Sequence, residues 1–301
     1  MYDIIIIGAG PAGLTAAIYA SRAMKKVLLL EAKSYGGQII NSMDIENYPG
    51  ELHISGIDFA TKLYNQAKEL GTEIKYQKVV EIVDNGKNKK IITTKEEYEC
   101  LSVIIATGSE TRKLGIENED KFIGKGISYC ATCDGNFFKN KSVAVVGGGN
   151  TALEDALYLS NIANEVFLIH RRDKFRGEEK TLTKLKEKEN VKIIYNSTVT
   201  KLNGEDYLTS IDIVDKENNI KQLIVSCLFI AIGRIPENEN FSKVIKLDEF
   251  GYIESDETCH TNTKGIFVAG DNRKKSLRQL VTATSDGAIA ATEAIKYLNE
   301  I

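Results

Sequence analysis

The sequence lacks several features, and each absence argues against a class of protein. No apolar run is long enough to span a bilayer, and the short run of isoleucines at 4–7 follows Asp3, where a signal peptide would have positive charge. The net charge of −3, with dispersed basic residues, gives no reason to expect a nucleic acid partner. We therefore expect a cytoplasmic protein that binds neither a membrane nor nucleic acid.

Cysteine, histidine and proline are also scarce. Five cysteines, with one close pair, are an odd number and do not resemble the disulfide framework of a secreted protein. Three histidines and a single C-x-x-C leave zinc short of four ligands, so no metal site is expected. Three prolines beside 24 glycines fit an α/β fold with many tight turns, in one large or two ordinary domains.

A glycine-rich turn lies near the start of the chain. Residues 3–7 predict a buried strand, residues 14–23 a helix and residues 26–30 a second strand, with Gly8, Gly10 and Gly13 in the turn between the first two. Glycines allow a pyrophosphate to approach the backbone at a helix N-terminus, and Glu31 is placed to accept a hydrogen bond from a ribose hydroxyl. The alternative is a glycine-rich turn without a ligand.

The same plan returns in the middle of the chain, which indicates an internal duplication of a βαβ unit. Strands are expected at 142–146 and 165–169, with a glycine turn at 147–152 and a helix at 153–160 between them. The second unit ends in His170-Arg171-Arg172, followed by Arg176, where the first has an acid. Guanidinium groups suit a 2′-phosphate, so this turn favours NADPH over NADH, unless the arginines only form a solvated loop.

Further strands predict where the chain leaves and re-enters its first domain. Residues 102–108 and 226–233 each form a short apolar strand that ends in a glycine turn, and loop-like segments follow at 110–113 and 236–240. A strand from Gly265 and a helix at 277–298 would return to the first domain. The second domain is then inserted in the first, and the two loop-like segments are candidate hinges.

Cys130-Ala-Thr-Cys133 lies just before the second glycine turn. This spacing allows the short disulfide loop used in redox exchange, although two unrelated core thiols remain an alternative. Asp134 directly follows and could exchange a proton with sulfur, or it could cap a turn. Phe137 and Phe138 are expected in the core, with docking of a partner as the alternative.

Over essentially its whole length the chain resembles the bacterial-type, low-molecular-weight thioredoxin reductases. The motifs behind the resemblance are the two glycine turns and the following segments: Gly36-Gly37-Gln38, Glu46-Asn47-Tyr48-Pro49-Gly50, Ala106-Thr107-Gly108, Cys130–Gly135, His170-Arg171-Arg172 with Phe175-Arg176, Gly270-Asp271 and Leu277-Arg278-Gln279. The resemblance implies two Rossmann-like dinucleotide-binding domains. An FAD domain would comprise residues 1–112 and 239–301, and an inserted NADPH domain residues 113–238.

The resemblance also implies roles for particular residues. FAD would be bound by Gly8, Gly10, Gly13, Glu31, Gly37, Gln38, Asn47, Asp271, Arg278, Gln279 and Leu280, and NADPH by Gly149, Asn150, Thr151, His170, Arg171, Arg172 and Arg176. Cys130 and Cys133 would form the redox disulfide, with Cys133 toward the flavin, Cys130 attacking thioredoxin and Asp134 as the acid. The implied protein is a homodimer in which a domain rotation alternates NADPH and the disulfide at the flavin.

The implied reaction passes a hydride from NADPH to FAD, then electrons to the Cys130–Cys133 disulfide, and then to oxidised thioredoxin. Asn136, Asn272 and Ser285 depart from the residues usual in the family. Ferredoxin-linked relatives and dithiol oxidases tend to lack the basic NADPH motif, and NADP-linked ferredoxin reductases lack the C-x-x-C. A peroxide-reductase flavoprotein would have an extra N-terminal redox domain, which we do not expect here. A nucleotide-binding redox sensor without turnover is the non-enzymatic alternative.

Overall fold

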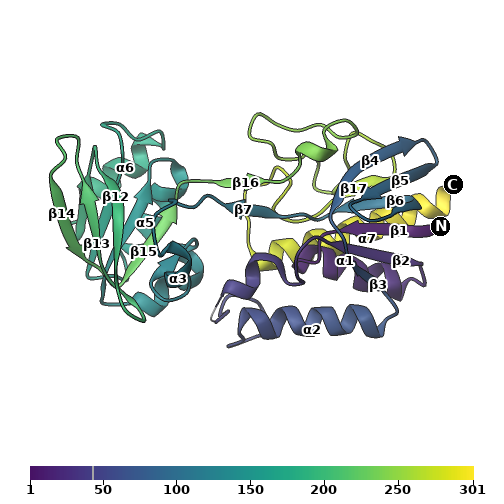
Figure 1. Ribbon diagram of the computed structural model, residues 1–301, viewed down its shortest axis with the longest axis horizontal. Coiled ribbons are helices and arrows are strands. Elements are labelled where there is room, and N and C mark those ends of the chain that lie inside the picture. The colour runs from purple at the N-terminus through teal and green to yellow at the C-terminus, as the bar shows by residue number, and fades with distance from the viewer. Residues whose placement is uncertain (43) are drawn as a thin grey trace. The chain divides into compact units, whose positions relative to one another are not determined.

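The computed structural model describes residues 1–42 and 44–301, and the chain divides into two compact units (Figure 1). Unit 1 comprises Met1–Glu110 and Ile235–Ile301, and unit 2 comprises Thr111–Arg234. The chain crosses between the units twice, in β7 (Ser109–Thr111) and β16 (Arg234–Pro236), which pair with each other as a two-stranded sheet. Unit 2 is thus an insertion within unit 1.

Unit 1 is built on a seven-stranded sheet with the order β3-β2-β1-β6-β5-β4 and β17 also paired to β6. Its strands are β1 (Tyr2–Ile7), β2 (Val27–Glu31), β3 (Glu73–Tyr76), β4 (Val79–Asn85), β5 (Asn88–Thr93), β6 (Glu97–Ile105) and β17 (Ile266–Val268). The strands β3, β2, β1, β6 and β17 are parallel, whereas β4 and β5 extend the sheet as an antiparallel hairpin.

The isoleucine run forms a strand because both faces of its sheet are covered. Ile4 and Ile6 lie in one buried cluster with α1, while Ile5 and Ile7 lie in another with Phe241. A strand alternates its side chains between faces, so four consecutive isoleucines fill two cores at once. Among the described residues, no helix is both long enough and apolar enough to cross a membrane.

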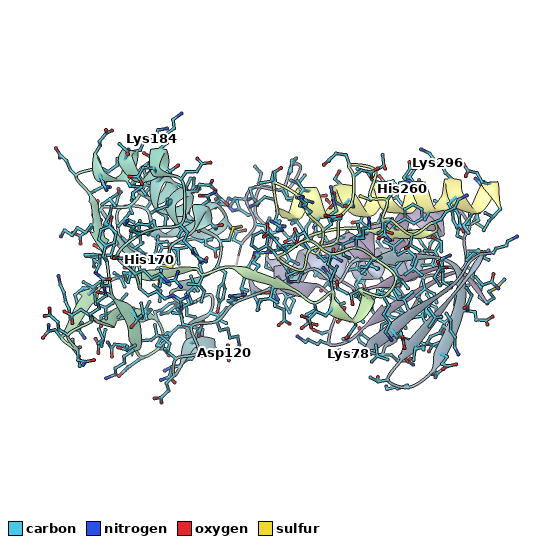
Figure 2. All side chains as sticks on the ribbon, turned by 90° about the horizontal axis from the view of Figure 1, so that it is seen from above. Lys78, Asp120, His170, Lys184, His260 and Lys296 are labelled. Atoms are coloured by element: carbon cyan, nitrogen blue, oxygen red, sulfur yellow. A yellow bond between two sulfur atoms is a disulfide. The ribbon has the colours of Figure 1, made fainter. Side chains whose placement is uncertain are left out.

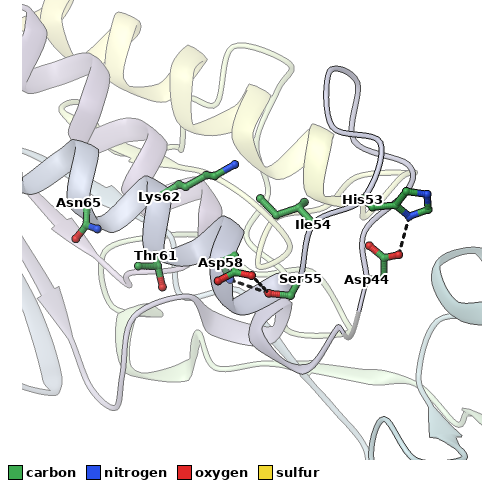
Figure 3. Close-up of a pocket in the computed structure, with 8 residues that line it drawn as sticks. All are labelled: Asp44, His53, Ile54, Ser55, Asp58, Thr61, Lys62 and Asn65. Atoms are coloured by element: carbon green, nitrogen blue, oxygen red, sulfur yellow. Dashed lines mark hydrogen bonds and ion pairs between the residues drawn. The ribbon is translucent and has the colours of Figure 1, made fainter.

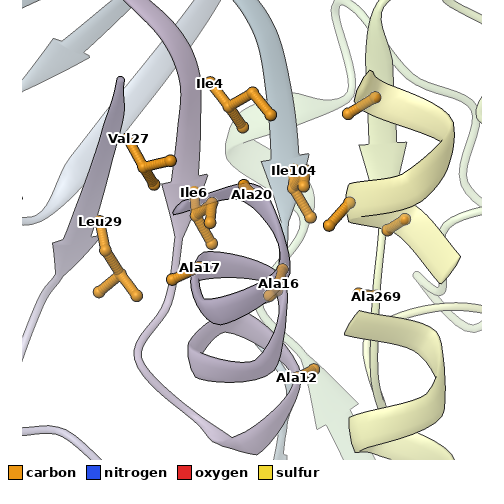
Figure 4. Packing of buried hydrophobic residues seen from close by; sticks show 14 of the residues in the cluster. Ile4, Ile6, Ala12, Ala16, Ala17, Ala20, Val27, Leu29, Ile104 and Ala269 are labelled. Atoms are coloured by element: carbon orange, nitrogen blue, oxygen red, sulfur yellow. The ribbon is translucent and has the colours of Figure 1, made fainter. Parts of the chain in front are cut away.

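The helices of unit 1 are α1 (Pro11–Arg22), α2 (Gly56–Glu69) and α7 (Leu280–Glu300), with 3₁₀ turns η1 (Gly37–Asn41) and η3 (Glu239–Phe241). Alanines at 12, 16, 17 and 20 form the buried side of α1 (Figure 4). They let α7 approach so closely that a Cβ on Gly287 would lie 2.2 Å from the carbonyl oxygen of Ala12. Small side chains thus fix the distance between these two helices.

Unit 2 contains a five-stranded parallel sheet with the order β11-β10-β9-β15-β8. Its strands are β8 (Ile127–Ser128), β9 (Ser142–Gly147), β10 (Glu165–Ile169), β11 (Val191–Ile194) and β15 (Cys227–Ala231), and its helices are α3 (Glu119–Phe122), α4 (Ala131–Asp134), α5 (Asn150–Leu159) and α6 (Glu179–Lys186), with the 3₁₀ turn η2 (Gly135–Phe138). A separate antiparallel sheet consists of β12 (Thr198–Gly204), β13 (Leu208–Val214) and β14 (Ile220–Ile224).

Side chains of β9 also alternate between the two faces of this sheet, and both faces are covered. Val143 and Val145 of β9 pack with α5 and α6, whereas Ala144 and Val146 pack with the antiparallel sheet. The predicted two-domain α/β fold of Rossmann type is therefore confirmed. Its second nucleotide-binding sheet is sandwiched between helices and a second sheet.

Some predicted helix boundaries were wrong, for two physical reasons. The helices α1 and α5 begin at Pro11 and Asn150, not at residues 14 and 153, because the last residues of each glycine motif already form the first helical turn. The final helix begins at Leu280 and not at residue 277, since Gln279 is its N-cap in a capping box with Thr282. The β4–β5 hairpin and the β12–β14 sheet were not predicted.

Candidate active site

The first glycine turn joins β1 to α1 and is tight at two positions. Gly8 has a φ of +107°, and a Cβ built on Gly13 would lie 1.9 Å from the carbonyl oxygen of Gly8. Gly10 differs, because no described atom lies within 4 Å of the position its Cβ would take. Gly8 and Gly13 therefore close the turn, and Gly10 leaves open space beside it.

Glu31, the last residue of β2, lies against this turn. Its two carboxylate oxygens accept hydrogen bonds from the N–H groups of Ala9 and Lys33, each at 2.7 Å. No described side chain caps the start of α1, so the N–H groups of its first turn remain available to a ligand. Open space at Gly10, uncapped donors and a fixed carboxylate fit the pyrophosphate and ribose of a dinucleotide.

Two more predicted segments reach the same region of unit 1. Gly37 stands against the first turn, since its Cβ position is 3.3 Å from the Cα of Gly10, and Gln38 follows it in η1. The amide of Asn47 donates a hydrogen bond to the side-chain oxygen of Gln279 at 3.3 Å. Residues far apart in sequence are thus brought together around the turn and the start of α7.

The segment that follows β17 contributes the predicted residues Asp271 and Arg278 to this region of unit 1. The Arg278 guanidinium donates a hydrogen bond to the carbonyl of Asp271 at 3.3 Å and lies over the ring of Tyr252, 4.1 Å from its centroid. Gly270, just before Asp271, packs against Ala12 of α1. The remaining predicted residue, Leu280, packs against the small hydrophobic cluster of Ile45, Ile54 and Phe59.

The second glycine turn joins β9 to α5 in unit 2 and has the same organisation. A Cβ on Gly147 would lie 2.3 Å from the carbonyl oxygen of Ala231, while no described atom is within 4 Å of the Cβ position of Gly149. Asn150 begins α5, followed by Thr151, and the Asn150 side chain accepts a hydrogen bond from the N–H of Glu178 at 2.8 Å. The loop after β10 is thereby tied to the turn.

His170 is a buried residue that packs against this loop and against the glycine turn. Its Nε2 lies 2.9 Å from the carbonyl oxygen of Lys174, its ring stacks on Phe175, and a Cβ on Gly148 would collide with it at 2.0 Å. Burial lowers the pKa of His170, which favours its neutral form (Figure 2 labels its place in unit 2). His170 therefore supports the turn and the loop by packing.

The three arginines of the loop, Arg171, Arg172 and Arg176, are exposed on its outer side. The N–H of Arg176 donates to the carbonyl of Gly148 at 2.7 Å, so the loop folds back onto the turn. Exposed guanidinium groups held next to an open glycine turn fit an anionic nucleotide with an additional phosphate.

Cys130 and Cys133 form a disulfide at the end of β8 in the same unit. Cys130 is the N-cap of the short helix α4, and the N–H of Asp134 donates to its carbonyl at 3.1 Å. The pair is half-buried, so one thiol of its reduced form can meet a large substrate. The expectation that both rings lie in the core was wrong for Phe137, which is 39% exposed and so accessible to a partner. Phe138 is partly buried and packs edge-to-face on Phe229.

Ser128, which the sequence reasoning missed, links Asp134 to the disulfide. Its hydroxyl donates to the Asp134 carboxylate at 2.6 Å and accepts from the N–H of Cys130 at 3.1 Å. Burial raises the pKa of the Asp134 carboxyl, and the hydrogen bond from Ser128 opposes this rise. A hydroxyl two residues before the first cysteine was the available sequence signal.

Glu119, which the sequence reasoning also missed, fixes the segment that enters unit 2 through hydrogen bonds. Glu119 is buried and accepts hydrogen bonds from the N–H groups of Leu114 and Gly115 and from the hydroxyl of Tyr129, at 2.8–3.0 Å. Tyr129 directly precedes Cys130. The entering segment is thus fixed to the residue beside the disulfide, and nothing in the spacing of the sequence indicated it.

Comparison with known proteins agrees with this geometry. The family model described as "Pyridine nucleotide-disulphide oxidoreductase" matches residues 2–287. Thioredoxin reductases of Listeria innocua and Bacillus subtilis are 43% and 42% identical over 100% of this chain and 95% and 96% of their own length. A crystal structure of the thioredoxin reductase from Streptococcus pyogenes is 39% identical, with a TM-score of 0.96 over 100% of this chain and 99% of that one.

The fold and the disulfide thus define a pyridine nucleotide–disulfide oxidoreductase. Within that class, the chain belongs to the thioredoxin reductase family. Members of this family use FAD and NADPH, and the two open glycine turns fit these cofactors.

Proposed function

We propose that this protein reduces the disulfide of thioredoxin with electrons from NADPH. The observation that supports this most directly is the half-buried Cys130–Cys133 disulfide, which shares unit 2 with an open glycine turn and an arginine-bearing loop. The full-length similarity to thioredoxin reductases supports the same substrate. A homodimer in the cytoplasm, as the resemblance implies, is part of the proposal.

The charge of the residues at or just after the end of the second strand of each glycine motif assigns one cofactor to each unit. FAD is assigned to unit 1, held by the Gly8–Gly13 turn, Glu31, Gly37, Gln38 and Asn47, with Asp271 and Arg278–Leu280 toward its ribityl and flavin parts. NADPH is assigned to unit 2, at Gly149–Thr151, at His170 and at the three loop arginines. When bound, FAD supplies the chemistry that connects a hydride donor to a disulfide acceptor.

The residues of unit 2 complete the reaction by thiol–disulfide exchange. The Cys130 thiolate attacks the thioredoxin disulfide, which forms a mixed disulfide and releases one thioredoxin thiolate. The Cys133 thiolate then attacks the Cys130 sulfur, which re-forms the Cys130–Cys133 disulfide and releases the second thioredoxin thiolate. The two protons of the dithiol end on reduced thioredoxin. We assign the transfer of a proton to Asp134, because burial raises its pKa and Ser128 holds its carboxylate beside the disulfide.

We further propose that the paired crossings β7 and β16 act as a hinge. The disulfide and the proposed NADPH site both belong to unit 2, and each must reach the flavin of unit 1 in turn. Rotation about two short strands would alternate them.

The experiment is an anaerobic assay with the FAD-loaded protein, NADPH and oxidised thioredoxin. The proposal predicts that NADPH bleaches the flavin band, that thioredoxin restores it, and that free thiols appear on thioredoxin. Bleaching without recovery would leave the cofactor assignments intact and reject thioredoxin as substrate. No bleaching by NADPH, with bleaching by reduced ferredoxin, would instead reject the role of the loop arginines.

A further inference from the structure

Three potential metal ligands lie together in unit 1, outside the proposed redox machinery. The Nδ1 of His53 is 2.8 Å from a carboxylate oxygen of Asp44 and 3.7 Å from one of Glu46. All three ligand atoms lie within 4.8 Å of one another. Figure 3 shows His53 and Asp44 facing each other across the loop that precedes α2.

The backbone places these side chains on one face. Ile45 and Ile54 form an antiparallel bridge in which the N–H of Ile45 donates to the carbonyl of Ile54 at 2.8 Å. Neighbouring residues in extended chains point to opposite sides, so Asp44 and Glu46 share the face opposite Ile45, and His53 the face opposite Ile54. In this register Glu46 stands directly across from His53.

The other face of the bridge is anchored, which limits the movement of the three ligands. Ile45 and Ile54 are buried with Phe59 of α2, and Ile39, Tyr48 and Leu280 pack against them. The ligand-bearing residues are thus the outward positions of a packed element, not of a free loop.

The local charge favours a cation. Asp44 and Glu46 contribute two negative charges, against at most one positive charge on His53. Lys62, which lines the same surface pocket as Asp44 and His53, is paired with Glu51 at 3.2 Å, and Asp58 accepts a hydrogen bond from Ser55 at 2.6 Å. Asp44 and His53 line a surface pocket, and Glu46 lies beside His53, so an excess of negative charge remains at Asp44 and Glu46.

We propose that Asp44, Glu46 and His53 bind one divalent transition-metal ion of the Zn²⁺, Co²⁺, Ni²⁺ or Mn²⁺ type. One imidazole nitrogen with two carboxylate oxygens suits these ions better than Mg²⁺ or Ca²⁺, which prefer oxygen ligands alone. Ligands about 2.0 Å from one tetrahedral ion are roughly 3.3 Å apart, and the two observed distances lie on either side of this value. Small side-chain adjustments are enough to form the site.

An ion here would connect residues 44–46 to residue 53 and so close the intervening loop. That loop includes Asn47, whose amide donates to Gln279 at the N-cap of α7. A bound metal would thus stiffen a segment assigned to the flavin site, and it would stabilise the folded protein in proportion to its binding.

The test is calorimetric titration of CoCl₂ and ZnCl₂ into FAD-loaded, oxidised, chelator-treated protein without a histidine tag. Oxidation matters because the Cys130–Cys133 dithiol would itself bind Zn²⁺, while the remaining thiols are buried. We expect about one ion per chain for the wild type, and affinity at least about tenfold weaker for His53→Ala and Glu46→Gln.

His260→Ala is the matched control. His260 also contacts a carboxylate, that of Glu293 in α7 at 3.2 Å, but it belongs to no such cluster among the described residues (Figure 2). We expect this variant to bind like the wild type, and the melting temperature to rise with metal in both but not in His53→Ala. No saturable binding by the wild type, or equal binding by His53→Ala and Glu46→Gln, would overturn the proposal. Unchanged melting of the metal-free variants ensures that neither result reflects misfolding.

Discussion

The two glycine turns share the strand–turn–helix plan and an open middle glycine, but they are followed by opposite charges at or just after the end of the next strand. In unit 1, β2 ends in Glu31, whose carboxylate accepts hydrogen bonds from the backbone of the turn region. In unit 2, β10 is followed by His170, which packs against the turn, and by exposed arginines. We propose that the backbone offers a dinucleotide site in both units, and that the residues at or just after the end of the second strand select which dinucleotide binds.

The units differ most in redox chemistry, so the largest expected effect comes from removing it. Replacing Cys130 or Cys133 by serine should reduce NADPH-dependent thioredoxin reduction to background, while bound flavin is retained. The measurement is turnover with thioredoxin alongside the ratio of flavin to protein. Cys227→Ala is the control, because this thiol is buried in the same unit and outside the disulfide. Normal turnover in either serine variant would contradict the assignment of the disulfide.

Asp134 should have the next largest effect. Asp134→Asn removes the proton donor and should slow thioredoxin reduction by about 10²- to 10⁴-fold. In the wild type, the rate should fall as pH rises through the raised pKa of Asp134, since the protonated acid is lost there. Ser128→Ala removes a hydrogen bond to the carboxylate, which raises this pKa further and shifts the falling limb to higher pH. A pH–rate profile of Ser128→Ala that shifts to lower pH would disprove this link.

The charge contrast between the turns can be removed directly. Changing Arg171 and Arg172 together to glutamine should raise the KM for NADPH by about 10²- to 10⁴-fold, because each charge-assisted hydrogen bond contributes about 1.5–3 kcal/mol and each 1.4 kcal/mol is about tenfold. The KM for NADH should hardly change. Lys180→Gln combined with Lys184→Gln, two exposed positions of α6, is the charge-matched control. An equal rise for both nucleotides would mean that the arginines do not read the 2′-phosphate.

The third small residue of the glycine motif differs between the units: it is Gly13 in the first and Ala152 in the second. Gly13→Ala should impair FAD binding and cost about 1–3 kcal/mol, since its Cβ would lie 1.9 Å from a carbonyl oxygen. Unit 2 already has Ala152 at this position, so Ala152→Gly should retain NADPH binding. Flavin content and thermal unfolding measure the first effect, and the KM for NADPH measures the second. Full flavin content in Gly13→Ala would show that the first turn can relax.

A smaller difference lies in the helices that follow the turns. Asp155 of α5 occupies the position that Ala16 takes in α1, and burial raises its pKa from 3.8 to about 7. The folded state therefore holds this proton more tightly than the unfolded state, so the stabilisation is full below about pH 4 and is lost as pH rises toward 7. Asp155→Ala should then unfold about 1–2 kcal/mol less easily than the wild type at pH 8, with no gain at pH 4. Denaturant unfolding at both pH values tests this, and the same difference at both would refute it.

The sequence predicted those parts of the molecule that depend on local pattern. The isoleucine run, the duplicated turns and the close cysteine pair each combine spacing with chemistry, and the structure places them as strands, tight turns and a disulfide. The helix starts after the two turns were misplaced because the last residues of each glycine motif, from Pro11 and from Asn150, already form the first helical turn. The local signals therefore held wherever neighbouring residues alone decide the structure.

The parts that the sequence did not predict depend on contacts between distant segments. Glu119 acts through hydrogen bonds to the backbone of residues 114 and 115, and no spacing rule identifies it. Ser128 acts through the Asp134 carboxylate and the N–H of Cys130, and its position two residues before the first cysteine was the one available signal. His170 was assigned to the nucleotide together with its neighbouring arginines, and only its packing on Gly148 and Phe175 indicates that it supports the loop. The cluster of Asp44, Glu46 and His53 likewise needs the Ile45–Ile54 bridge to form.

The central claim is that both nucleotide sites and the disulfide form one route for electrons. The most direct test is an anaerobic titration of the FAD-loaded protein with NADPH, followed by counting of the thiols at Cys130 and Cys133. The account predicts two new thiols at these residues, and their loss when one equivalent of oxidised thioredoxin is added. Bleaching of the flavin without new thiols at Cys130 and Cys133 would contradict it.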